Sequence, residues 1–168
     1  MPRLSLSFHA GTLTLLLACS ATAASAQAVR TEKNMSSALA TQLAAKAVAD
    51  CQAANHAVTA TVVDRAGVVQ AVQRGDGAGP HTLEASRLKA YTAASAKSGT
   101  LALMVNAQRN PASANLVNIP GYLLLGGGLP VQVGNEVVGA VGVAGAPGGH
   151  LDEQCAAVAI AAVKDLLK

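Results

Sequence analysis

The stretch GYLLLGGGLPVQVGNEVVGAVGVAGAPGGH, residues 121–150, decides the fold because it holds ten of the chain's sixteen glycines between runs of leucine and valine. A phosphate-binding loop needs a lysine and a serine or threonine directly after its glycines, where a helix begins. Here Gly126–Gly128 is followed by Leu129–Val131, an extended run without lysine. The later glycines are spaced as GxxGxxG, which is not the dinucleotide-binding fingerprint. The stretch is therefore not a nucleotide-binding loop.

We interpret the same stretch as three β-strands joined by tight turns. Valine is enriched in strands, and a glycine inside a strand allows another backbone to approach closely or the strand to bend. The run Leu123–Leu125 is expected to be a buried strand. Gly134-Asn135 is predicted as the hairpin turn between the last two strands.

The rest of the chain predicts four helices and one more hairpin. Apolar residues at four-residue spacing predict a helix over about 34–55. Two β-rich runs joined by Asp64–Gly67 predict a hairpin, because aspartate starts turns readily and glycine accepts the left-handed conformation. The remaining elements are a helix from Thr82 (its N-cap) to Gly99, a short helix in 100–107, an exposed loop over 108–121 and a final helix over 150–168.

This order of elements predicts an α/β chain of the α+β type. Five strands joined mainly by hairpins form an antiparallel sheet, and the first and last helices can then pack side by side on one face. We expect residues 27–168 to form a single domain, because this length is enough for one core and too short for two comfortable ones.

The first residues have the composition of a secretory signal peptide. Arg3 precedes a short apolar run, and Ala24-Ser25-Ala26 is a small-residue cleavage site. We expect cleavage after Ala26 and a periplasmic or secreted product, because the apolar run is too short to span a bilayer. The alternative is a lipoprotein tethered through Cys19 in the run LLAC. No second segment is long enough to be transmembrane.

Charge and aromatic content argue against nucleic-acid binding. Once Arg3 is removed, eleven of the twelve Lys and Arg residues remain against nine Asp and Glu, and no run of basic residues concentrates this small excess. The only aromatic residues left are Tyr91 and Tyr122. Proteins that bind nucleic acids use basic patches or aromatic stacking surfaces, and this chain offers neither.

Cys51 and Cys155 are the only cysteines that remain after cleavage. An even pair in an oxidising compartment predicts a disulfide. Cys51 lies late in the first predicted helix and Cys155 early in the last, as two antiparallel neighbours require. Two buried free thiols are the alternative, while a metal pair has no CxxC pattern and no adjacent histidine to support it.

An ordered set of short motifs runs through the chain: V-D-x-x-G, D-G-A, K-A-x-T-A, G-G-G-x-P, V-G-A-x-G-V and D-E. Over about residues 38–167, this set resembles the GlcG/HbpS family of haem-binding proteins, which includes the C-terminal domain of PduO-type proteins. The resemblance implies a profilin-like fold with a five-stranded antiparallel sheet, homo-oligomers, and haem or a related tetrapyrrole as ligand. The family's haem ligand is not one invariant motif residue, so the resemblance assigns no ligand position.

Three histidines remain after cleavage, and imidazole is a good axial ligand for haem iron. His56 follows a predicted helix end and is explained as a C-terminal cap. His81 and His150 each follow a glycine-rich loop and precede a helix, where a polar residue can also serve only to close the helix start. Of the three, we favour His81 as the iron ligand.

Lys89, in the K-A-x-T-A motif, is a candidate partner for the haem propionates, and Arg87 is a weaker one because it can pair with Glu84. Tyr91 is a candidate for stacking on the porphyrin or ligating it, although a half-buried helical tyrosine is the commoner case.

No nucleophile elbow GxSxG and no zinc helix HExxH occurs in the sequence, so no reaction is identified. The resemblance, together with the signal peptide, leads us to expect an exported haem-binding protein that captures, buffers or senses haem. The alternatives are a haem-dependent redox or haem-degrading enzyme, and a non-haem module that binds a small organic acid or a corrinoid.

Overall fold

The computed structural model describes residues 28–168, of which residues 32–168 form one compact unit. The predicted signal peptide, its cleavage after Ala26 and the alternative lipidation of Cys19 lie outside the described residues. None of the helices within residues 28–168 has both the length and the apolar character needed to cross a membrane.

The described chain has an α+β fold with one antiparallel sheet. Its elements are α1 (Ser37–Ala53), β1 (Thr59–Asp64), β2 (Val69–Arg74), α2 (Thr82–Ala96), α3 (Thr100–Arg109), the 3₁₀ helix η1 (Pro111–Asn118), β3 (Gly128–Val133), β4 (Glu136–Ala144), α4 (Gly149–Ala162) and the 3₁₀ helix η2 (Lys164–Leu166). The strand order is β2-β1-β4-β3, and every neighbouring pair is antiparallel.

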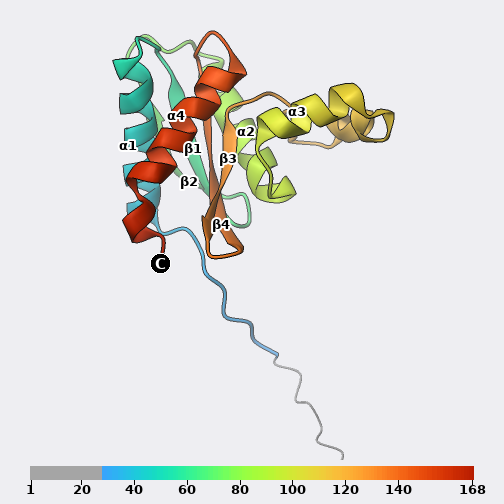
Figure 1. Ribbon diagram of the computed structural model, residues 1–168. Helices are drawn as coiled ribbons and strands as arrows, with labels where there is room; N and C mark the ends of the chain where they lie inside the picture. Colours follow the sequence, from blue (N-terminus) through green and yellow to red (C-terminus); the bar gives the residue numbers. More distant parts are fainter. Residues whose placement is uncertain (1–27) are drawn as a thin grey trace, which may run out of the picture. The chain divides into compact units, whose positions relative to one another are not determined.

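The sheet lies between two layers of helices. Figure 1 shows α1 and α4 side by side on one face, as predicted, while α2 packs on the other face. Strand β1 contributes to both layers, because its side chains alternate between the two faces. Val62 points into the core beneath α1 and α4, whereas the hydroxyl of Thr61 lies 2.7 Å from that of Ser86 on α2.

The close fit of α2 on the sheet explains one of the glycines inside β4. A β-carbon at Gly142 would overlap the carbonyl oxygen of Ser86 and would lie 2.5 Å from the backbone nitrogen of Ala90. The backbone of β4 therefore touches the backbone of α2, which is the close approach predicted from the glycines in this strand.

The sheet has four strands, so the prediction of five is wrong. The segment 121–127 is irregular, because side chains of the neighbouring helices bind its backbone groups in place of a strand. The Leu123 N–H donates to Thr92 Oγ1 at 2.8 Å, and the Leu125 carbonyl accepts from Thr100 Oγ1 at 2.7 Å. Leu125 is 42% exposed, so the prediction of a buried strand here is also wrong. The profilin-like class stays a prediction.

Both predicted hairpins are confirmed. Strands β1 and β2 are joined by a turn in which Asp64 Oδ1 accepts from the N–H groups of Ala66 and Val68, and Gly67 has φ +81°. Strands β3 and β4 are joined at Gly134, which has φ +61°. Each glycine occupies the left-handed region that the turn requires.

Helix α3, the predicted short helix, continues into η1 to form an arm (residues 101–120) that extends away from the sheet in Figure 1. The predicted exposed loop is therefore partly helical, since Pro111 begins η1 and the Asn110 side chain accepts from the Ala112 N–H. None of residues 101–120 is buried.

The predicted disulfide is confirmed. Cys51 and Cys155 are bonded, with their Cα atoms 5.5 Å apart, and join the last turn of α1 to the second turn of α4. The bond therefore ties together the two helices that cover one face of the sheet.

Candidate functional site

A pocket of about 250 Å³ lies between the first half of α2 and the loop that leads into α4. The N-cap residue His81 and two residues of α2, Ala85 and Lys89, face it at four-residue spacing, which places them on one side of the helix. The lining residues are His81, Ala85, Lys89, Leu125, residues 144–149 and Asp152. The pocket is therefore built from parts of the sequence that lie far apart.

Lys89 lies at this pocket and is almost completely buried, with 1% of its surface exposed. Its Nζ donates to Asp152 Oδ2 at 2.7 Å and to the backbone carbonyl of Val143 at 2.9 Å. A buried ammonium needs such partners, because its desolvation is costly. The ion pair thus joins α2 to α4 and to the end of β4.

Asp152 also holds the loop that forms one wall of the pocket. Its Oδ1 accepts from the Ala146 N–H at 2.9 Å, while its Oδ2 binds Lys89. Burial raises the pKa of the Asp152 carboxyl, although the charge of Lys89 and these hydrogen bonds oppose the rise. Sequence reasoning missed Asp152, because an acidic residue in the first turn of a helix is already explained by the helix dipole.

His81 is exposed at the rim of the pocket. It occupies the N-cap position of α2, and its side chain makes no capping hydrogen bond. The prediction that Thr82 is the N-cap is wrong: Thr82 is the first helical residue and is buried, with its hydroxyl 2.7 Å from that of Thr59 on β1. The sheet holds Thr82 and leaves His81 at the surface.

Asn55 and His56 form the C-terminal end of α1. Asn55 has φ +62°, and the His56 N–H donates to the Cys51 carbonyl at 2.9 Å, which completes a Schellman cap. The His56 side chain lines a separate cavity of about 210 Å³ between α1 and α4. His56 is thus part of a helix end, as expected. Within residues 28–168, no three His, Cys, Asp or Glu side chains are grouped so that they could hold a metal ion.

The sequence of residues 35–161, which includes the whole pocket, matches the family described as haem-degrading protein HbpS-like. The chain belongs to the HbpS-like family.

Solved structures support the same assignment. HbpS is 40% identical and superposes with a TM-score of 0.76 over 84% of this chain and 97% of its own. The Klebsiella pneumoniae protein ORFY is 32% identical, with a TM-score of 0.72 over 82% and 97%. A complex of the PduO C-terminal domain with haem is 25% identical, with a TM-score of 0.69 over 77% and 94%.

A curated relative is an uncharacterized 15.0 kDa protein from Citrobacter freundii, encoded between dhaT and dhaS. It is 37% identical over 93 residues, which make up 54% of this HbpS-like chain and 66% of the relative. The match therefore spans just under two thirds of the relative's own length.

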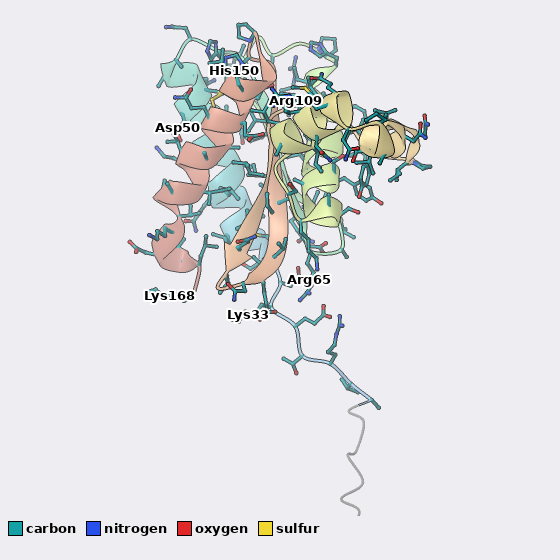
Figure 2. All side chains as sticks on the ribbon, turned by 45° about the vertical axis from the view of Figure 1, so that its right-hand side comes forward. Lys33, Asp50, Arg65, Arg109, His150 and Lys168 are labelled. Carbon is teal, nitrogen blue, oxygen red and sulfur yellow. A yellow bond between two sulfur atoms is a disulfide. The ribbon has the colours of Figure 1, made fainter. Side chains whose placement is uncertain are left out.

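The structure separates the other predicted site residues of this HbpS-like chain from the pocket lining. His150 is exposed in the first turn of α4, at the opposite end of the C-terminal helical segment from Lys168 (Figure 2), and it does not line the pocket, although Gly148 and Gly149 do. Tyr91 follows His81 by ten residues, about 15 Å along α2. Its ring lies against Gly67 and Gly121 and meets Tyr122 edge to face, with 6.4 Å between ring centroids.

Arg87, the weaker propionate candidate, is paired on the surface of α2. Its Nε and Nη2 donate to both carboxylate oxygens of Glu84, at 2.8 and 2.7 Å. The Arg87 hydrogen bonds lower the pKa of Glu84. The predicted Glu84–Arg87 ion pair is therefore confirmed.

Proposed function

We propose that this HbpS-like protein binds haem, with His81 as the axial ligand of the iron. The observation that carries the proposal is an exposed imidazole at the rim of a pocket whose other polar side chains, Lys89 and Asp152, satisfy each other. Imidazole is a common haem ligand. The haem complex of the PduO C-terminal domain, a relative with the same fold, supports the proposal.

The size of the pocket favours binding at a rim over full enclosure. At about 250 Å³, the pocket is smaller than the roughly 300–1,000 Å³ of cavities that enclose drug-sized ligands. One edge of a porphyrin enters it, and the exposed side chain of Leu125 extends the apolar surface next to it. The rest of the porphyrin needs a second covering surface.

We propose that a second copy of the chain covers the part of the porphyrin that lies outside the pocket, so that the protein is a homo-oligomer. The arm supports this, because Val117 and Ile119 are 59% and 41% exposed and no residue of the arm is buried within the chain. A groove of about 520 Å³ also runs between α3 and Glu153 of α4. Exposed apolar patches of this kind are typical of protein interfaces.

Lys89 belongs to the proposed site as part of its wall, where its ion pair fixes α2 against α4. His150 is the alternative iron ligand, since it is exposed beside the same loop. Tyr91 lies at a different part of α2, and we do not include it in the site.

We further propose that the protein is exported to the periplasm or secreted and that it captures, buffers or senses haem there. The disulfide between Cys51 and Cys155 supports this location, because disulfides persist mainly in oxidising compartments.

A second candidate function is haem breakdown, which the description of the family favours. In that case the bound iron supplies the chemistry, and the chain positions and partly covers the porphyrin. Incubation of the haem complex with peroxide and a reductant decides between the two: loss of the Soret band with release of iron supports breakdown, and a stable spectrum supports capture.

Titration of the purified protein with hemin, followed by absorbance, tests the proposed function. We expect a saturable Soret shift that is lost or altered in His81→Ala and retained in His150→Ala. A shift retained in His81→Ala and lost in His150→Ala moves the ligand to His150. The absence of any saturable shift in the wild type rules out haem binding.

A further inference from the structure

Two glycines each lie against the ring of a histidine that follows two residues later in the chain. Gly79 precedes His81 by two residues at the start of α2, and Gly148 precedes His150 by two residues at the start of α4. A β-carbon at Gly79 would lie 2.8 Å from Cε1 and 2.9 Å from Nδ1 of His81. At Gly148 the corresponding distances to His150 are also 2.8 and 2.9 Å. Each imidazole thus lies directly over a glycine.

The backbone does not require glycine at either position. Neither Gly79 nor Gly148 has a positive φ, unlike Gly77 and Gly145 nearby. The three atoms nearest to a β-carbon at Gly79 all belong to the His81 ring. Glycine at residue 79 therefore leaves room for the His81 imidazole.

The orientation of the ring distinguishes its two nitrogens. The Nδ1–Cε1 edge of His81 lies against Gly79, whereas Nε2 is 3.9 Å from the β-carbon position. Nε2 is thus the ring nitrogen farther from Gly79, and a neutral imidazole can offer its lone pair to a metal there.

We propose that Gly79 is a positioning residue: its lack of a side chain leaves room for the His81 imidazole at the rim of the pocket, in the orientation in which Nε2 is the atom that ligates haem iron. The inference rests on the proposed function. Gly148 provides the comparison for the position of the ring, because it lies against His150 in the same way; Gly148 lines the pocket, whereas His150 does not. An alanine at residue 79 must displace the ring, and a ligand moved from its position costs roughly 10–100-fold in metal affinity.

The test uses Gly79→Ala and Gly148→Ala in the whole protein, with two measurements. The first is the NMR spectrum of the histidine ring protons and nitrogens without ligand, which reports the position of each imidazole. The second is a hemin titration that gives the Soret maximum and the Kd. We expect Gly79→Ala to move the His81 signals, to shift the Soret maximum and to raise the Kd about tenfold or more. Gly148→Ala should move only the His150 signals. Because Gly148 itself lines the pocket, the control for hemin binding is Gly134→Ala in the turn between β3 and β4, where no atom lies within 4 Å of a β-carbon; it should leave hemin binding unchanged.

Several results overturn the inference while leaving haem binding in place. One is a Gly79→Ala protein that binds hemin as the wild type does; another is an equal loss of affinity in Gly79→Ala and in the control Gly134→Ala. His81 signals that do not move in Gly79→Ala also contradict it, and this readout needs no haem. If the wild type binds no hemin, the proposed function fails, and with it the assignment of Nε2 as an iron ligand, while the NMR spectra still show whether Gly79 positions the ring.

Folding is checked by thermal unfolding of the same variants. If Gly79→Ala is destabilised, the double variant Gly79→Ala/His81→Ala is compared with His81→Ala alone. Equal unfolding temperatures for these two proteins show that the ring was the clashing group, as the inference requires. A double variant that remains destabilised shows that the backbone itself needs glycine, which contradicts it.

Discussion

The ammonium of Lys89 lies 2.7 Å from a carboxylate oxygen of Asp152, and both side chains are almost completely buried between α2 and α4. The two residues are 63 positions apart in the sequence. Because Asp152 also binds the Ala146 N–H, this ion pair fixes a helix, a strand end and a loop around the candidate site.

Removing only one partner of the Lys89–Asp152 ion pair should lower the stability of the fold. Lys89→Met leaves the buried carboxylate of Asp152, whose charged form burial already disfavours, without a counter-charge, so we expect the free energy of unfolding at neutral pH to fall by about 3–5 kcal/mol. Lys89→Met/Asp152→Asn removes both charges and keeps an amide oxygen for the Ala146 N–H, and it should recover most of the loss. Urea unfolding measures both variants. A double variant as unstable as the single one contradicts this explanation.

The raised pKa of Asp152 predicts an unusual pH dependence. Its folded-state pKa lies above the ordinary value of 3.8, so between the two values the folded state binds more protons than the unfolded state. Its contribution to stability is therefore largest below pH 3.8 and decreases as the pH rises through the folded-state pKa. Unfolding of the wild type and of Lys89→Met/Asp152→Asn across this window measures the effect. A wild type that gains stability over the double variant as the pH rises shows the opposite sign.

The disulfide should contribute much of the stability of the domain. It closes a loop of 104 residues, for which the chain-entropy model gives about 4–5 kcal/mol. We expect Cys51→Ala/Cys155→Ala to lower the free energy of unfolding by this amount in a urea titration. A reductant should lower the free energy of unfolding of the wild type by a similar amount and leave that of the double variant unchanged. Equal sensitivity of both proteins to the reductant argues against a role for this bond.

Gly142→Ala should lower the free energy of unfolding much more than the replacement of a glycine that has no neighbouring atoms. The new β-carbon would overlap the Ser86 carbonyl and force α2 away from β4, so we expect a loss of about 3 kcal/mol or more. Gly134→Ala is the control: no atom lies within 4 Å of its β-carbon position, and only its positive φ costs about 1–2 kcal/mol. The two unfolding curves decide the point, and equal losses refute the packing argument.

The arm gives a test of the proposed oligomer. Val117→Asp/Ile119→Asp places two charges on apolar side chains that are already exposed in the single chain. We expect the variant to keep the wild-type unfolding temperature at low concentration and to shift towards monomers in size-exclusion chromatography with light scattering. Gln108→Asp, on the same arm, is the control and should leave assembly unchanged. If all three proteins elute as monomers, the oligomer proposal is wrong.

Local patterns in the sequence predicted those parts of the fold that depend on neighbouring residues. The two hairpins follow from the turn chemistry at Asp64–Gly67 and Gly134-Asn135, and the helices follow from apolar spacing. The disulfide was predictable because both cysteines lie on the apolar sides of helices that a hairpin-rich sheet leaves on one face.

The errors arose where distant side chains replace local bonding. Leu123–Leu125 has the composition of a strand, but Thr92 and Thr100 bind its backbone, and nothing within the segment reveals those partners. Thr82 has the identity of an N-cap, yet a hydrogen bond to Thr59 on β1 draws it into the core. The partnership of Asp152 with Lys89 likewise depends on a contact between helices, which one sequence does not disclose.

Because the arm lies between the two cysteines in the sequence, the disulfide determines what happens when a protease cuts the arm. Residues 101–120 lie after Cys51 and before Cys155, and none of them is buried. A protease that cuts the chain once in this segment therefore leaves two fragments that the disulfide still joins covalently. Such a nicked protein would run as one species on a non-reducing gel and as two after reduction.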